Sequence, residues 1–211
     1  ACTSTDLPAE TVSSQLHKFR VVPLAKGLEH PWGIAFLPDN GILVSERAGR
    51  LRLYQNGHLD SKPIANVPKV VDSGQGGLFD VTLHPDFGKN QLLYLAYAAR
   101  GPGGVHTRVT RYRYDAKAHT LSDAKQIFDA SPKVSGGRHF GGRMVFDRRG
   151  FLFITLGDRG DMGRAQETAD HSGSVVRVHD DGRIPSDNPL RIRKRAKPEI
   201  YSFGHRNPQG M

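Results

Sequence analysis

The sequence predicts an all-β protein of the β-propeller type, because one pattern of strand, polar turn and strand recurs along the chain. Each unit pairs two short apolar stretches around a turn, as expected for a small antiparallel sheet. The three units lie at 31–46, 78–97 and 142–155. Phe36, Leu83 and Phe146 occupy equivalent positions in them and are 47 and 63 residues apart. A β-sandwich is the structural alternative, but it does not predict the recurring unit.

The turns within the units favour hairpins. Asn40-Gly41 and Arg149-Gly150 suit tight turns, because glycine adopts the positive φ that such turns demand. In the second unit, Lys89-Asn90 leads from one strand into the next. The spacing of the units exceeds that of a usual blade, which predicts inserted loops, and long loops tend to carry function.

Further strands are expected between the units. The alternation of small or aromatic residues with arginine over 108–114 is typical of a half-buried strand. Other stretches with strand character are 51–54 and 174–179, and a fourth unit is expected to open at 209–211. Only 162–171 has helical character, and it is short.

Composition excludes several classes of protein. The 211 residues carry a formal charge of +9 with histidine neutral, and the single cysteine excludes a disulfide framework and any multi-cysteine metal site. No window approaches the roughly 20 apolar residues of a membrane-spanning helix. The densest basic run, Arg191–Lys197, has no interleaved aromatic residues to stack on bases, so we expect a solvated loop and no nucleic-acid partner. A basic surface also suits an anionic small ligand or a negatively charged membrane.

The first residues are small and polar and lack periodicity. We therefore expect residues 1–20 to be a flexible processed leader and residues 21–211 to form the propeller domain. A small residue before Cys2 and a polar tether after it resemble the end of a bacterial lipoprotein signal, which would make Cys2 a lipid anchor. The simpler interpretation is a chance cysteine near the start of the chain.

Two glycine-rich loops are candidate functional segments. In Ser135–Arg143, two glycine pairs bracket Arg138-His139-Phe140, and such glycines are useful where a ligand approaches the backbone closely. His139 can serve there as a general base near neutral pH, or it can bond neighbouring backbone and merely shape the loop. In Asp72–Gly77, the absence of a following Lys-Ser/Thr argues against a phosphate-binding loop, and a turn that brings Gln75 near a planar group is favoured.

Several motifs, in order, carry a family resemblance from about His30 to the end of the chain. They are Gly74-Gln75-Gly76-Gly77-Leu78-Phe79-Asp80, Leu83-His84-Pro85-Asp86-Phe87, Ser135-Gly136-Gly137-Arg138-His139-Phe140-Gly141, Leu156-Gly157-Asp158-Arg159-Gly160, Asp180-Asp181-Gly182-Arg183-Ile184-Pro185-Ser186-Asp187-Asn188-Pro189 and Tyr201-Ser202-Phe203-Gly204-His205-Arg206-Asn207-Pro208-Gln209-Gly210. In these motifs the chain resembles the soluble aldose sugar dehydrogenases of the glucose/sorbosone dehydrogenase family, which use pyrroloquinoline quinone.

The resemblance implies a six-bladed propeller, of which this chain would supply the first three to three and a half blades. By motif, His139 corresponds to the catalytic base, Gln75 to a cofactor contact, and Arg206 and Asn207 to the pair that holds the quinone. The implied reaction oxidises the C1 hydroxyl of an aldose sugar to a lactone, with electrons passing to an unidentified acceptor.

The resemblance also implies calcium, whose ligands we expect beyond Met211, and an exported, periplasmic location. We expect the 211-residue chain alone to be inactive, because the later blades bring further cofactor contacts. Two other functions stay open: a propeller that only binds ligands or proteins, and a calcium-dependent lactone hydrolase.

Overall fold

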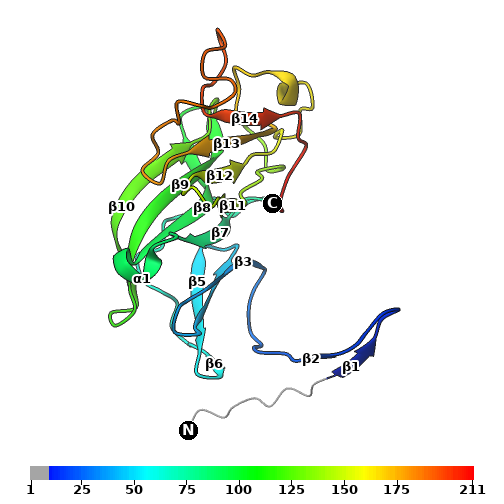
Figure 1. Cartoon of the computed structure of the whole chain (residues 1–211), viewed down its shortest axis with the longest axis vertical. Coiled ribbons are helices and arrows are strands. Elements are labelled where there is room, and N and C mark those ends of the chain that lie inside the picture. Colours follow the sequence, from blue (N-terminus) through cyan, green and yellow to red (C-terminus); the bar gives the residue numbers. More distant parts are fainter. Residues whose placement is uncertain (1–9) are drawn as a thin grey trace.

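The computed structural model describes residues 10–211, and nearly all of its regular structure is β-strand (Figure 1). The first sheet has the order β3-β4-β5-β6, formed by β3 (Pro31–Phe36), β4 (Ile42–Glu46), β5 (Arg50–Gln55) and β6 (His58–Leu59). The second has the order β7-β8-β9-β10, formed by β7 (Leu78–Leu83), β8 (Leu92–Gly101), β9 (Gly104–Asp115) and β10 (Thr120–Asp129). The third has the order β11-β12-β13-β14, formed by β11 (Met144–Phe146), β12 (Leu152–Thr155), β13 (Ser174–Val178) and β14 (Ile200–Phe203).

Each sheet is an antiparallel meander in sequence order, which is the blade of a propeller. The expected all-β, propeller-type fold is therefore confirmed. The three predicted units open the three blades, and the predicted strands at 51–54, 108–114 and 174–179 are β5, β9 and β13.

The strand β8 shows how the blades pack. Its side chains are buried on both faces, and alternate residues enter different cores. Leu93 and Leu95 pack with the first blade, whereas Tyr94 and Ala96 pack with the third. A strand sandwiched in this way needs a near-continuous apolar run, which is what this segment has.

A buried carboxylate joins the second and third blades. Asp80 on β7 accepts hydrogen bonds from the main-chain N–H of Met144 (2.8 Å) and from Arg143 (2.8 Å), while Arg143 lies over the ring of Trp32. Asp80 is only 2% exposed, and burial raises its pKa to about 6 despite these donors. This junction is polar, whereas the cores on either side of it are apolar.

Two of the three expected turns are confirmed. Asn40 adopts a φ of 66° between β3 and β4, and Gly150 a φ of 81° between β11 and β12. The turn at Lys89-Asn90 is instead a short helix, α1 (Phe87–Asn90), which ends on Gln91 in the left-handed conformation. The ring of Phe87 is buried in the core between the first two blades, so packing fixes this turn as a helix.

The expected helix over 162–171 is wrong. Only a 3₁₀ turn, η1 (Arg164–Gln166), forms there. Asp161 accepts the main-chain N–H of Gly163 (3.1 Å), and Asp170 accepts that of Ser172 (2.8 Å). These local side-chain bonds compete with the main-chain hydrogen bonds of a longer helix. No strand forms at 209–211, where the fourth unit was expected to open.

The N-terminal segment differs from the expected leader within the part that the structure describes. β1 (Glu10–Ser13) and β2 (Lys18–Val21) form a hairpin that pairs with no other strand described here, and Figure 1 shows it apart from the blades. The turn is fixed by Ser14, whose hydroxyl oxygen accepts the main-chain N–H of His17 (3.0 Å). The expected boundary after residue 20 thus falls inside β2, and Cys2 lies outside the described residues.

Candidate active site

Strand direction brings the predicted site residues to one end of the blades. In an antiparallel meander, the start of the first strand and the ends of the second and fourth strands lie at the same end. Gln75 precedes β7, His139 precedes β11, Asp158 follows β12, and Arg206 follows β14. We call the four segments 72–77, 135–143, 156–160 and 204–207 the site loops.

His139 lies at the centre of the site loops. Its Nδ1 is 2.6 Å from Oδ1 of Asp158, and its side chain is 14% exposed. The backbone of His139 is in the left-handed region, with a φ of 54°. A residue other than glycine pays a conformational cost there, so surrounding contacts must hold it.

Asp158 is the partner that the sequence analysis did not single out. Its side chain is 4% exposed, and Oδ1 also accepts the main-chain N–H of Gly160 (2.7 Å). The main-chain N–H of Asp158 donates to the carbonyl of Arg206 (2.8 Å), which ties this loop to the one after β14. A carboxylate directly after a buried strand, at the same end as His139, is the pattern that could have revealed it.

Gln75 contacts the histidine loop directly. Its Oε1 accepts the main-chain N–H of His139 (2.7 Å), and its own N–H donates to the carbonyl of Gly137 (2.6 Å). The neighbouring Gly74 permits this approach, since a Cβ there would overlap the Gly137 carbonyl. The close approach that the sequence predicted at this turn is thus made to a second loop of the chain.

Asn207 plays a parallel part on the other side. Its Oδ1 accepts the main-chain N–H of Gly141 (3.1 Å). Gly157 leaves room for this arrangement, because a Cβ there would overlap the His139 carbonyl and lie 3.0 Å from Asn207 Oδ1. Gln75 and Asn207 therefore each hold one end of the segment 139–141 through an amide oxygen.

A cleft of about 620 Å³ opens beside His139. Arg138, His139, His205 and Arg206 are among its lining residues, and the lining carboxylate, Asp158, is paired with His139. The guanidinium groups of Arg138 and Arg206 are exposed and make no hydrogen bond or ion pair within residues 10–211. The cleft is therefore cationic and open to an anionic ligand.

The structure thus brings together all four predicted residues. His139 and Arg206 line the cleft, whereas Gln75 and Asn207 support the histidine loop. Within the described part of the chain, no group of three histidine, cysteine or acidic side chains could hold a metal ion. The same residues include no helix with the length and apolar character to cross a membrane.

Comparison with known proteins gives one family match. The family model described as Glucose / Sorbosone dehydrogenase matches residues 28–211. Over 186 residues, the chain is 45% identical to the aldose sugar dehydrogenase YliI of Escherichia coli. This match covers 87% of this chain and 50% of the relative. The chain spans about half the length of the curated relatives it matches.

Solved structures agree with this match. A glucose dehydrogenase superposes with a TM-score of 0.85 at 47% identity, covering 89% of this chain and 59% of that one. The pyrroloquinoline-quinone-bound aldose sugar dehydrogenase of Streptomyces coelicolor superposes with a TM-score of 0.76 at 30% identity, covering 95% of this chain and 56% of that one.

Proposed function

The chain belongs to the glucose/sorbosone dehydrogenase family, and we propose that its protein is a quinoprotein oxidoreductase acting on aldose sugars. The reaction is oxidation of the C1 hydroxyl to a lactone. The observation that carries this proposal is the His139–Asp158 pair at the edge of a cationic cleft. A base oriented by a carboxylate beside an anion-binding surface is what such a reaction requires of the protein.

The donor set of the cleft fits pyrroloquinoline quinone, which carries three carboxylates. Arg206 and Arg138 offer planar guanidinium forks to carboxylate or carbonyl oxygens. Gln75 and Asn207 do not line this cleft. Their amide oxygens accept main-chain N–H groups, which leaves the NH₂ group of each as the donor that we propose for the cofactor. A cleft of about 620 Å³ lies within the range of cofactor sites.

His139 is proposed to take the proton of the C1 hydroxyl. With Nδ1–H donating to Oδ1 of Asp158, Nε2 carries the lone pair and acts as the base. Asp158 then stabilises the imidazolium that forms, while its second bond, from Gly160, keeps the carboxylate in place. Pyrroloquinoline quinone, when bound, supplies the two-electron acceptor for the hydride that leaves C1.

Calcium enters the proposal only as an expectation from the family. No step is assigned to the metal. The electron acceptor, an exported location and a lipid anchor at Cys2 are likewise expectations from the sequence.

The 211-residue chain alone is proposed to be inactive. Ile34 and Phe36 on β3 are 55% and 68% exposed, along a groove shared with β7 and β11. Apolar exposure of this kind favours association, and the resemblance implies that later blades bring further cofactor contacts. Size-exclusion chromatography and dye reduction of residues 1–211, beside the intact natural protein, test this. A monodisperse, sugar-oxidising 211-residue monomer would overturn it.

The test of the function uses the intact natural protein reconstituted with quinone and calcium. Dye reduction with several aldoses, and lactone as the product, are the expected results. The same preparation is offered a lactone, because lactone hydrolysis without dye reduction would identify the hydrolase instead. Bound quinone with neither activity would leave a binding propeller and remove the dehydrogenase proposal.

A further inference from the structure

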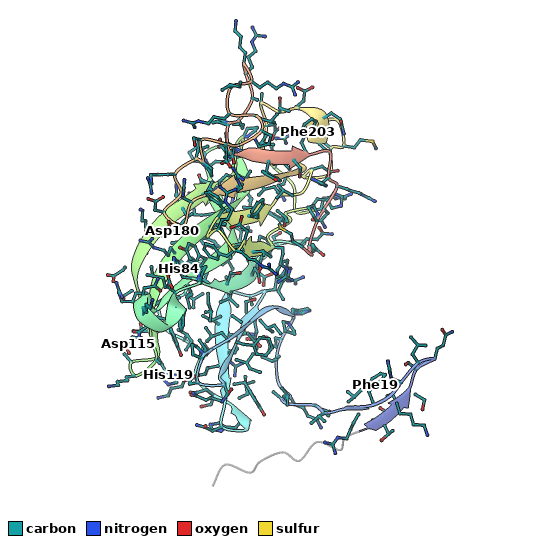
Figure 2. The ribbon with its side chains drawn as sticks, in the orientation of Figure 1. Phe19, His84, Asp115, His119, Asp180 and Phe203 are labelled. Carbon is teal, nitrogen blue, oxygen red and sulfur yellow. The ribbon has the colours of Figure 1, made fainter. Side chains whose placement is uncertain are left out.

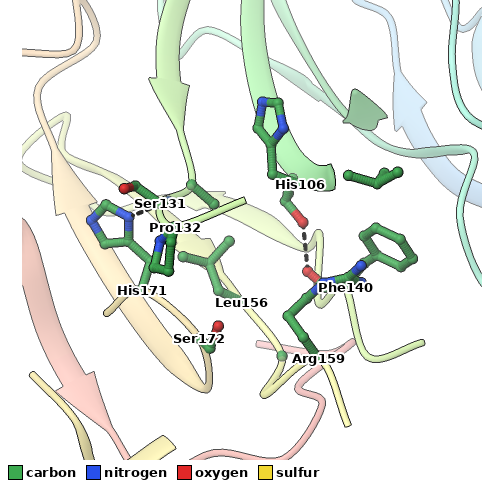
Figure 3. Close-up of a pocket in the computed structure, with 12 residues that line it drawn as sticks. His106, Ser131, Pro132, Phe140, Leu156, Arg159, His171 and Ser172 are labelled. Carbon is green, nitrogen blue, oxygen red and sulfur yellow. Dashed lines mark hydrogen bonds between the residues drawn. The ribbon is translucent and has the colours of Figure 1, made fainter. Parts of the chain in front are cut away.

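Arg159 makes an unusual set of contacts next to the site. Its Nη1 donates to the carbonyl of Arg138 (2.6 Å) and its Nη2 to the carbonyl of Gly136 (2.7 Å). The guanidinium carbon lies 3.5 Å from the centroid of the Phe140 ring, and Figure 3 shows the two side chains together. One side chain therefore contacts the loop on both sides of His139, the residue that carries the base.

The guanidinium group has no carboxylate partner among the described residues. Burial, reinforced by the nearby charge of Arg164, lowers the pKa of Arg159 to about 10, so the group stays charged at neutral pH. Two carbonyl dipoles and an aromatic face compensate the charge in place of an anion. We call these three contacts of Arg159, with the carbonyls of Gly136 and Arg138 and the ring of Phe140, the loop clamp.

Arg159 is also poorly placed to bind a ligand itself. It does not line the cleft beside His139. The small cavity that it does line, with Phe140 and Leu156, measures about 10 Å³, which is room for one water molecule at most. Its effect on a reaction must therefore pass through the loop.

The loop needs such a clamp. His139 has a φ of 54°, and Gly136 and Gly141 on either side have φ values of 103° and 67°. Glycines leave this segment many other conformations, so the left-handed histidine persists only when its surroundings fix it. Gln75 fixes the N–H of His139, and Asp158 fixes its ring. On the N-terminal side, Arg159 fixes the carbonyls of Gly136 and Arg138, and the main-chain N–H of Gln75 fixes that of Gly137.

We propose that Arg159 is a positioning residue, which holds the carbonyls of Gly136 and Arg138 so that the His139 imidazole stays against Asp158. The inference rests on the proposed function, since it assigns Arg159 a part in orienting the base. Adjacent residues of one loop then act on one histidine: Asp158 on its ring and Arg159 on its backbone.

The clamp is local, which makes it testable. Phe140 is also held by Thr107, whose hydroxyl donates to the Phe140 carbonyl (2.8 Å), and by the ring of Phe79. Loss of the Arg159 guanidinium should therefore free 136–139 and leave Phe140 in the core.

The experiment compares Arg159→Lys and Arg159→Met with the parent in the intact natural protein. The matched control is Arg149→Lys, since Arg149 lies over the ring of Phe151, outside the site loops. Three quantities are measured: hydrogen exchange of 136–142 without quinone, the quinone dissociation constant, and the pH profile of kcat.

In both Arg159 variants, exchange over 136–142 should rise about tenfold or more, and kcat should fall by up to about 10²-fold, the cost of a small misplacement. Quinone affinity should stay within about threefold, because Arg159 does not line the cleft. Lysine should not rescue kcat, since one ammonium cannot reproduce a two-pronged grip on both carbonyls. The control should match the parent.

Unchanged exchange over 136–142 in both variants, or full kcat in Arg159→Lys, would overturn the proposal. If Arg159→Met fails to fold, the lysine variant, which keeps the charge and most of the volume, decides the matter. A parent protein that binds quinone but oxidises no sugar would overturn the proposed function, and the exchange measurement would still report whether Arg159 holds the loop.

Discussion

The blades and the site loops are built in opposite ways. In the blades, stability is spread over many apolar contacts: Leu93 and Leu95 on β8 are fully buried within one apolar cluster. Figure 2 shows Phe19, on the β1–β2 hairpin, apart from the crowded side chains of the blades. In the site loops, single hydrogen bonds hold the conformation, such as those that Gln75 Oε1 accepts from the His139 N–H and Asn207 Oδ1 from the Gly141 N–H. The blades should therefore determine stability, and the loops the chemistry.

The largest expected effect separates chemistry from folding. In the intact protein, His139→Ala should lower turnover by roughly 10²–10⁴-fold, the usual range for a general base. Quinone affinity and the melting temperature should stay close to the parent. Steady-state dye reduction measures turnover, quinone titration measures affinity, and thermal unfolding measures the melting temperature. His58→Ala, at an exposed position in β6, is the control, and turnover within a few-fold of the parent would make His139 a structural histidine.

The converse change should alter stability without altering the site. Leu95→Ala removes a side chain that is 0% exposed between the first two blades, so it should lower the free energy of unfolding by about 2–5 kcal/mol. Below the melting temperature, turnover and quinone affinity should be unchanged. Urea denaturation checks the first statement, with Leu16→Ala, at an 85% exposed position, as the control. A comparable loss in turnover would show that blades and loops are coupled.

A third change tests the polar junction between blades. The pKa of Asp80 is raised to about 6 in the fold, so the folded state holds its proton over a pH range where the unfolded chain has released it. This group therefore destabilises the fold as the pH rises from about 4 to about 6, by about 3 kcal/mol in total.

The measurement is the difference in unfolding free energy between the parent and Asp80→Asn at several pH values. Because asparagine does not titrate, the difference should shift in favour of the variant between pH 4 and pH 7. A pH-independent difference would mean that Asp80 keeps an ordinary pKa.

Asp129 affects stability with the opposite sign. Its pKa is lowered by His106, Arg108 and Lys133 against the effect of burial, and its stabilising contribution is lost as the pH falls below 4.

The smallest effect concerns the exposed cation of the cleft. Arg206→Lys should weaken quinone binding about tenfold, since a point charge cannot replace a bidentate fork. Stability should change by less than about 0.5 kcal/mol, because the side chain is exposed and makes no hydrogen bond in the described structure. Titration of the quinone-free protein checks the affinity. An unchanged dissociation constant would place Arg206 outside the cofactor site.

The blades can be predicted from local features of the sequence. Alternating or continuous apolar residues and glycine turns are local features, and they located the strands at 31–36, 42–46 and 152–155 closely. The near-continuous apolar run of β8 also carries the information that it is buried on both faces. Local patterns do not predict the structure where packing or side-chain hydrogen bonds determine the backbone conformation, as in α1 and in the 3₁₀ turn over Arg164–Gln166.

The site residues His139, Gln75, Arg206 and Asn207 came from motifs, which name residues but not their partners. The partners are visible in the folded chain alone: Asp158 meets the ring of His139, Gln75 and Asn207 hold the loop by their amide oxygens, and Arg159 binds two of its carbonyls. These bonds join segments 19 to 66 residues apart. Hydrogen bonding between such distant segments leaves no periodic trace in the sequence, because each bond depends on one atom placed where loops of the third blade, or of the second and third blades, meet.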